Sequence, residues 1–206
     1  MRGLINRKGG NMSIATITEY LNKLRDISTD AVNTVEYGHH ETHSGSRFYV
    51  LYSVASLGAM GSPDDMITLT FKTPDTTKWG HFVFTAYGSS GVRVRLIEGP
   101  TGGAASATGT LNILNKNRNY NISKKSTFTN GTTASVVNYD ATLATGGTTL
   151  WDDYIPGSTN GLVGSGTSGK RDELVLLQNT TYQLSAYGTA TEPATLYIDW
   201  YEHTNR

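Results

Sequence analysis

From residue 31 onward the chain is a succession of short segments in which apolar and polar side chains alternate, separated by clusters of glycine, serine and threonine. In residues 65–72, for example, Ile67, Leu69 and Phe71 fall on one side of an extended chain and polar residues on the other. About nine to eleven such segments recur at a spacing of about 8–12 residues, which is typical of two packed antiparallel sheets. The sequence therefore predicts an all-β fold, an antiparallel β-sandwich or jelly roll.

Twelve segments are candidates for these strands: residues 31–41, 47–57, 65–72, 79–87, 92–98, 111–117, 126–128, 134–139, 148–154, 173–177, 181–187 and 195–203. The strand over 65–72 is expected to be half-buried. Residues 79–87 and 92–98 are expected to pair as a hairpin, because Gly88-Ser-Ser-Gly91 between them is typical of a tight turn. The glycine- and serine-rich stretches 99–110 and 157–169 are predicted to be long loops.

The first 30 residues differ from the rest of the chain. Apolar residues recur at helical spacing over residues 13–28, at Ile14, Ile17, Leu21 and Leu24. A helix of about four turns is marginal alone, so it is expected to dock on its own domain, form a short trimeric coiled coil or anchor on a partner. We divide the chain into an N-terminal helix or arm, residues 1–30, and a sandwich domain, residues 31–206. Translation starting at Met12 instead of Met1 is an open alternative.

Composition excludes several functional classes. The formal net charge is +0, which gives no argument for nucleic acid or an anionic membrane as a partner and leaves self-association open. The chain has no cysteine, so disulfides and zinc–thiolate sites are absent. No apolar run of about 18 residues is present, so no membrane-spanning helix is predicted.

The segment Tyr37-Gly-His-His-Glu-Thr-His-Ser-Gly45 concentrates metal-ligand types. On a strand, His39, Glu41 and His43 share one face and suit zinc, manganese or iron, as in a cupin-like metalloprotein. The alternative is that these side chains only make structural hydrogen bonds, and we expect no metal or other cofactor. The carboxylate pairs Asp64-Asp65 and Asp152-Asp153 could bind calcium, or they could only cap turns. The three tryptophans could form a sugar-binding platform, or they could lie in the core.

Six segments in the same order resemble one family of tailed-bacteriophage virion structural proteins. They are Glu36–Gly45, Thr73–Trp79, Ile97–Thr101, Asn117–Asn119, Asp172–Tyr182 and Asp199–Thr204. The similarity spans residues 36–204 and leaves the first 30 residues outside.

The resemblance implies a non-enzymatic role, with no catalytic residues to transfer. It implies a capsid decoration (cement) protein on the exterior of the virion, made in the cytoplasm of a bacterial host. The body would be a jelly roll, the assembly a homotrimer, and the partner the major capsid protein. Residues 1–30 would make the capsid contact, with Ile14, Ile17, Leu21 and Leu24 as apolar anchors. A tail or head-fibre component that binds host-surface glycans is the second hypothesis, and the cupin-like metalloprotein the third.

Overall fold

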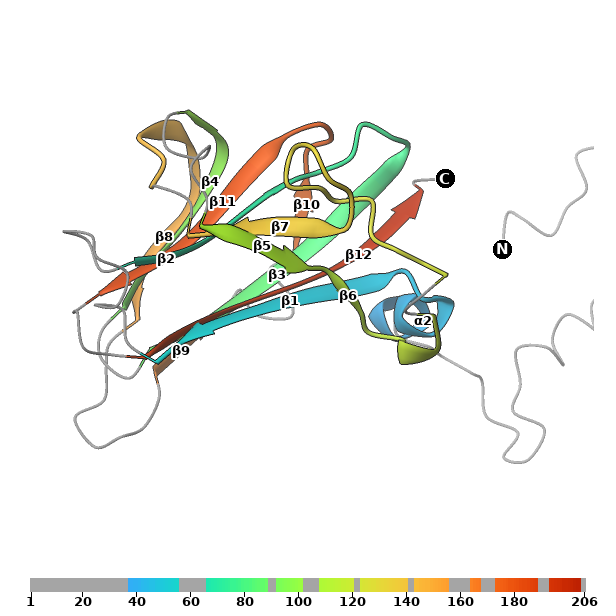
Figure 1. Cartoon of the computed structure of the whole chain (residues 1–206), viewed down its shortest axis with the longest axis horizontal. Coiled ribbons are helices and arrows are strands. Elements are labelled where there is room, and N and C mark those ends of the chain that lie inside the picture. The colour runs from blue at the N-terminus through green and yellow to red at the C-terminus, as the bar shows by residue number, and fades with distance from the viewer. Residues whose placement is uncertain are drawn as a thin grey trace, which may run out of the picture. The chain divides into compact units, whose positions relative to one another are not determined.

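The computed structural model describes residues 37–55, 66–88, 92–101, 108–120, 123–140, 143–155, 164–167, 173–188 and 193–204. The chain divides into two compact units, residues 1–39 and 40–206, and all strands that the structure describes belong to the second unit. Two antiparallel sheets pack face to face in it, which confirms the all-β sandwich prediction (Figure 1).

Each sheet has six strands. The first sheet has the order β10-β3-β12-β1-β6, with β9 also paired to β3. Its strands are β1 (Arg47–Val54), β3 (Lys78–Gly88), β6 (Leu114–Asn115), β9 (Gly164–Thr167), β10 (Leu174–Leu176) and β12 (Ala194–Thr204). The second sheet has the order β5-β7-β2-β11-β4-β8. Its strands are β2 (Met66–Lys72), β4 (Val92–Thr101), β5 (Gly109–Asn112), β7 (Val136–Tyr139), β8 (Gly146–Ile155) and β11 (Thr181–Gly188).

The strand pairing is that of a jelly roll. The pairs β1/β12, β2/β11, β3/β10 and β4/β8 are nested antiparallel pairs, as in one long hairpin, and successive pairs alternate between the two sheets. Wrapping this hairpin brings β12 beside β3 and β11 beside β4. The segment between β4 and β8 supplies the extra edge strands, β6 beside β1 and β5–β7 beside β2.

This pairing corrects the predicted hairpin. The strands themselves form as predicted, and in β4 the valines and Leu96 face the core while Arg93 and Arg95 face outward. However, β3 lies in the first sheet and β4 in the second, so the two strands do not pair. A glycine-rich connection suits a hairpin and a crossing between sheets equally well, and only the partner strands β12 and β11 decide between them.

The predicted strand over residues 31–41 is also wrong where the structure describes it, because Tyr37–Ser44 forms the helix α2. The helix ends at Gly45, whose φ of 73° is left-handed. The Gly45 amide donates to the Thr42 carbonyl (3.1 Å) and the Ser46 amide to the Glu41 carbonyl (2.9 Å). This is the Schellman arrangement, in which glycine is preferred at the left-handed position after the last helical residue. In the sequence, Gly45 therefore marks the end of a helix.

An aromatic cluster joins the two sheets in the core. Phe71 of β2 lies 5.2 Å from Phe82 of β3 and 5.6 Å from Phe128, measured between ring centroids. Phe128 stacks on Trp200 of β12 at 4.8 Å, and Tyr182 of β11 stacks on Phe71 at 5.7 Å. All these rings are essentially inaccessible to solvent, so this cluster is the centre of the hydrophobic core.

The outer side of β2 is buried as well, which corrects the prediction of a half-buried strand. Thr68 and Thr70 are buried, as is Gln183 of the neighbouring β11. The Gln183 amide donates to Thr70 Oγ1 (3.3 Å) and its carbonyl accepts from the Ala144 amide (2.8 Å). The segment before β8 therefore covers this part of the sheet and satisfies its polar groups.

Substitution of Gly80 tests how closely the aromatic cluster is packed. A Cβ atom at this position would lie 2.5 Å from Cζ of Phe128, so the ring would have to move. We expect Gly80→Ala to lower the free energy of unfolding by about 1–3 kcal/mol in urea titrations. In a Phe128→Ala background the clash is absent, and the same substitution should change stability by less than about 0.5 kcal/mol. An equal loss in both backgrounds would contradict this packing.

The hydrogen bond from Tyr52 of β1 to Asp140, just after β7, gives a pH prediction. Burial raises the pKa of Asp140, and hydrogen bonds from Tyr52 and Thr68 only partly oppose this. An acid whose pKa is higher in the folded state stabilises the fold below its unfolded pKa, and this contribution is lost as pH rises through the folded value. We therefore expect the stability of Asp140→Asn relative to the unmodified protein to increase as pH rises from about 4 to 7.

Asp152→Asn is the control of opposite sign. The hydrogen bond from Arg93 lowers the pKa of Asp152, so this carboxylate stabilises the fold above its unfolded pKa, and the contribution is lost as pH falls through the folded value. The Asp152→Asn variant should lose stability relative to the unmodified protein as pH rises from about 2 to 4, and should change little from about 4 to 7. Parallel pH profiles for the two variants, measured by urea unfolding, would show that the Asp140 assignment is wrong.

Candidate functional site

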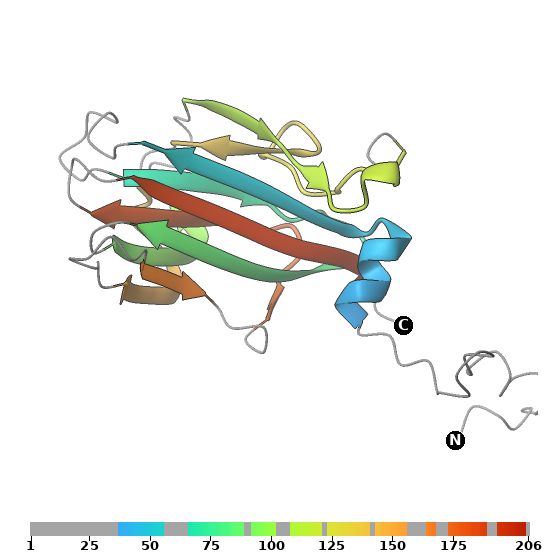
Figure 2. The same ribbon diagram turned by 90° about the horizontal axis from the view of Figure 1, so that it is seen from below.

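The outer surface of the first sheet carries most of the side chains that can bind another molecule. Because alternate residues of a strand point to opposite sides, one set from β1, β3, β10 and β12 faces away from the core. We call this surface the aromatic face, and its rings are Tyr49, Trp79, His81, Tyr87, Tyr197, Tyr201 and His203. Figure 2 views the molecule from the side on which β1, β12 and β3 lie next to each other.

Asp199 forms the polar centre of the aromatic face. Its carboxylate accepts two hydrogen bonds from the Arg47 guanidinium, from Nε (2.9 Å) and from the terminal nitrogen (2.8 Å). Lys116 donates to the same carboxylate and lies 5.6 Å from the ring centroid of Tyr197. Asp199 is only 6% exposed, so a buried carboxylate holds two cations in place between the rings.

A second polar group lies at one end of the face, where β3, β10 and β12 meet. His81 Nδ1 hydrogen-bonds to Glu173, and Tyr201 Oη donates to the same Glu173 oxygen (2.8 Å). The rings of His81 and Tyr201 stack with centroids 4.5 Å apart. His81 Nε2 and His203 Nε2 face each other at 2.5 Å. The two imidazoles are thus held by their neighbours in one orientation.

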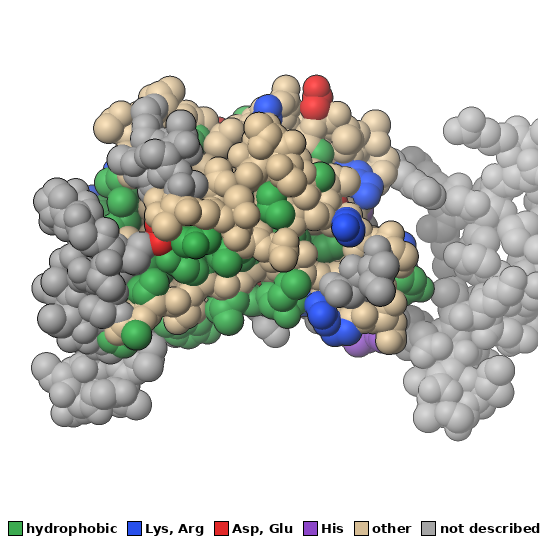
Figure 3. Space-filling view, viewed as in Figure 1, with side chains coloured by type: hydrophobic (Ala, Val, Ile, Leu, Met, Phe, Trp, Pro, Cys, Tyr) green, Lys and Arg blue, Asp and Glu red, His purple; other side chains and the backbone are tan. Residues whose placement is uncertain are grey.

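Large apolar side chains around these polar groups are exposed. Leu51 is 56% exposed, Val175 48%, Tyr87 40% and Trp79 39%. In Figure 3 hydrophobic side chains gather along the lower edge of the molecule, where Figure 1 places β1. Several large exposed apolar side chains on one surface are typical of protein–protein or ligand contacts.

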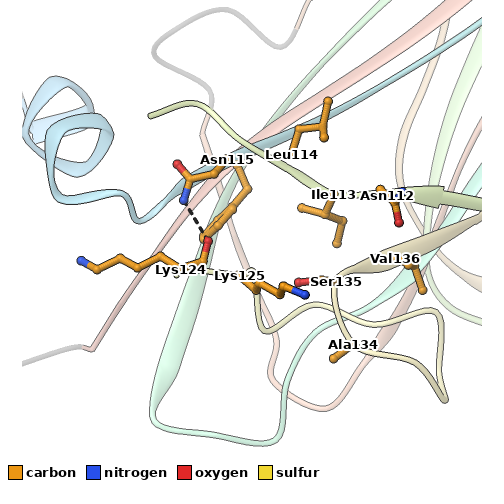
Figure 4. Close-up of a pocket in the computed structure, with 10 residues that line it drawn as sticks. Asn112, Ile113, Leu114, Asn115, Lys124, Lys125, Ala134, Ser135 and Val136 are labelled. Carbon is orange, nitrogen blue, oxygen red and sulfur yellow. Dashed lines mark hydrogen bonds between the residues drawn. The ribbon is translucent and has the colours of Figure 1, made fainter. Parts of the chain in front are cut away.

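Two small pockets lie at the end of the sandwich near α2. The larger, about 300 Å³, is lined by residues 112–115, 124–125 and 134–136 together with Phe48 (Figure 4). Asn115 Nδ2 donates to the carbonyls of Gly45 (2.8 Å) and Lys124 (3.1 Å), and its Oδ1 accepts from the Asn117 amide (2.9 Å). Asn115, which is buried in the wall of this pocket, is therefore already engaged in holding the loops together. We place the candidate site on the aromatic face instead.

The predicted metal cluster is not formed as expected. On α2, residues 39 and 43 lie one turn apart, whereas residue 41 is about 200° away around the helix axis. His39 and His43 are exposed, while Glu41 is buried and its carboxylate accepts from Ser44 Oγ (3.2 Å). No group of three or more His, Cys, Asp or Glu residues in the described ranges is arranged to hold a metal ion. The strand geometry on which that hypothesis depended is wrong.

The other predicted sites have separate outcomes. The anchor residues Ile14, Ile17, Leu21 and Leu24 and the pair Asp64-Asp65 lie outside the described residues. Of the tryptophans, Trp200 is in the core, Trp151 of β8 packs edge-on against Phe84 (5.8 Å), and only Trp79 is on the aromatic face. They do not form a single sugar-binding platform. Asp152 pairs with Arg93 Nε at 2.7 Å, which favours a structural role over calcium binding.

Sequence reasoning did not identify the aromatic face as a site. The sequence does contain a local sign of this face, because in β3 and β12 the odd-numbered residues supply its rings and the even-numbered residues face the core. What brings the two strands together is their register, with His81 opposite Tyr201 and Trp79 opposite His203. That pairing joins residues more than 100 positions apart, and no local pattern reveals it.

Comparisons with known proteins identify no relative. A scan against models of protein families finds no match, and a comparison with curated proteins finds no similar sequence. Within the part of the chain that the structure describes, no helix has the length and apolar character needed to cross a membrane.

Asp199→Asn tests the polar centre of the aromatic face. The amide keeps the shape of the side chain but removes the charge that holds Arg47 and Lys116. We expect a loss of about 2–3 kcal/mol in the free energy of unfolding, since hydrogen bonds to a buried charged group are broken. Asp152→Asn breaks an ion pair in which Arg93 is half exposed, and should cost clearly less. Equal losses for both variants would contradict the special role of Asp199.

Proposed function

We propose that this chain is a non-enzymatic structural protein of a tailed-phage virion, a decoration protein that binds the lattice of the major capsid protein on the capsid exterior. The observation that carries the proposal is the aromatic face. It is an exposed, ring-rich surface whose polar groups are already tied to each other, as Asp199 is to Arg47 and Lys116. Such a surface suits packing against protein better than it suits turnover of a substrate.

The segments that resemble phage virion proteins support the same conclusion. Hydrogen bonds join them in pairs far apart in sequence. Asn117 Nδ2 donates to the His43 carbonyl (3.1 Å), Thr73 Oγ1 to the Leu177 carbonyl (2.6 Å) and Tyr182 Oη to Glu98 (2.8 Å). The resemblance therefore falls on the residues that fasten strands and loops of the sandwich, which fits a family whose shared feature is architecture.

We assign the aromatic face to contact between copies of the chain in a homotrimer. The net charge is zero, so copies do not repel one another at long range. The contacts in a closed threefold ring are heterologous, so one side of the face meets the other side in the next copy. Val175 at the β10 side and Leu51 at the β1 side are the most exposed apolar side chains of this face. Three N-terminal arms would then bind the capsid together, which multiplies a weak contact into high avidity.

Charge substitutions test the trimer interface. Leu51→Asp and Val175→Asp each place a carboxylate in the apolar contact, and we expect either to convert trimers to monomers in light-scattering measurements. Tyr154→Asp is the matched control, because Tyr154 is 62% exposed but lies on β8 of the second sheet. A trimer that survives both face substitutions, or dissociates with Tyr154→Asp alone, would contradict the assignment.

Deletion of residues 1–30 tests the capsid contact separately. We expect the shortened chain to keep the β-sheet component of its circular dichroism spectrum and to remain a trimer, but to lose co-sedimentation with phage heads that lack the protein. Asp substitutions at Ile14, Ile17, Leu21 and Leu24 should reproduce the loss. Unchanged binding after the deletion would rule out the arm as the anchor.

Glycan binding is the second candidate, favoured by Trp79. Its half-exposed indole lies directly opposite His203 in the strand register, so a stacking ring adjoins a hydrogen-bonding group. Two results together would favour a tail or head-fibre component. The protein would bind sugars on a glycan array and lose this binding in Trp79→Ala, and it would not bind phage heads.

A further inference from the structure

The two facing imidazoles of the aromatic face have an arrangement that the proposed structural role does not require. His81 on β3 and His203 on β12 are diagonal neighbours on the same side of the sheet, because Tyr201 is opposite His81 and Trp79 opposite His203. Their Nε2 atoms lie 2.5 Å apart. Both side chains therefore direct the same ring nitrogen at one point in space.

The other nitrogen of each ring is fixed by an oxygen acceptor. His81 Nδ1 hydrogen-bonds to the Glu173 carboxylate, which also accepts from Tyr201 Oη at 2.8 Å. His203 Nδ1 donates to the Thr204 carbonyl at 3.3 Å. Histidines that bind metals are oriented in the same way, with Nδ1–H on a carboxylate or backbone carbonyl and Nε2 directed at the ion.

We propose that a divalent transition-metal ion binds between the two imidazoles, coordinated by His81 Nε2 and His203 Nε2. Bonds of about 2.0–2.1 Å in tetrahedral geometry place two nitrogens about 3.3 Å apart, so the rings need to separate by less than about 1 Å. His203 is only partly buried, which leaves it room to turn. Glu173 contacts the far side of the His81 ring, so it orients the ligand and balances charge without coordinating.

The ligand chemistry selects the ion. Imidazole nitrogens suit zinc, copper and nickel, whereas magnesium and calcium prefer oxygen. Two protein ligands leave further positions open for water. A bound ion would connect β3 to β12, and through Glu173 it would also hold the adjoining edge strand β10, which has only three residues.

Equilibrium dialysis of the full-length chain without a histidine tag tests the site. The chelator-treated protein is dialysed against Zn²⁺, and bound zinc is measured by elemental analysis. We expect one zinc ion per chain, lost in His203→Ala and His81→Ala, and bound about 10- to 100-fold more weakly by Glu173→Gln. The melting temperature should rise with Zn²⁺ in the unmodified protein but not in His203→Ala. Circular dichroism confirms that each variant is folded.

A double variant, His39→Ala with His43→Ala, is the matched control. These histidines lie one turn apart on α2 and form the other pair able to compete for zinc. Retention of one zinc per chain by this variant supports the proposal. Absence of zinc from the unmodified protein would overturn it, as would zinc that survives His203→Ala but disappears with the α2 double variant. Undiminished affinity in Glu173→Gln would overturn the positioning role of that carboxylate.

Discussion

The register of β12 between β1 and β3 is the constraint on which the core and the candidate site both depend. Leu196, Ile198 and Trp200 face inward and are inaccessible to solvent. Asp199 and His203 face outward and meet their partners on β1 and β3. A slip of one residue would exchange the two sets, burying charges and exposing Trp200. Packing of the core therefore fixes the geometry of the aromatic face.

Alternation in the sequence was enough to predict the class of fold and most of the strands. The strands β2, β4, β11 and β12 fall where apolar residues alternate with polar ones, because one side of each strand faces the apolar core. The alternation does not determine which strands pair with each other. The pairing of β3 with β12 instead of β4 is decided across the whole chain, and so is the meeting of His81 with His203.

The site prediction failed for two different physical reasons. The segment 39–43 was assigned strand geometry, in which alternate side chains converge, but a helix that stops at Gly45 separates them. That error is local, because the helix and its stop are formed by neighbouring residues. The role of Asn115 is not local, because this side chain is buried and donates to the carbonyl of Gly45, 70 positions away.

The proposed cement function requires a rigid body, a surface for neighbouring copies and an anchor on the capsid. The jelly roll with its aromatic cluster supplies the first, and we assign the aromatic face and residues 1–30 to the other two. The most direct test is the temperature at which phage heads lacking this protein release their DNA, measured with and without the purified chain added. We expect saturable binding and a higher release temperature. Heads that bind no protein, or bind it and release DNA at an unchanged temperature, would contradict it.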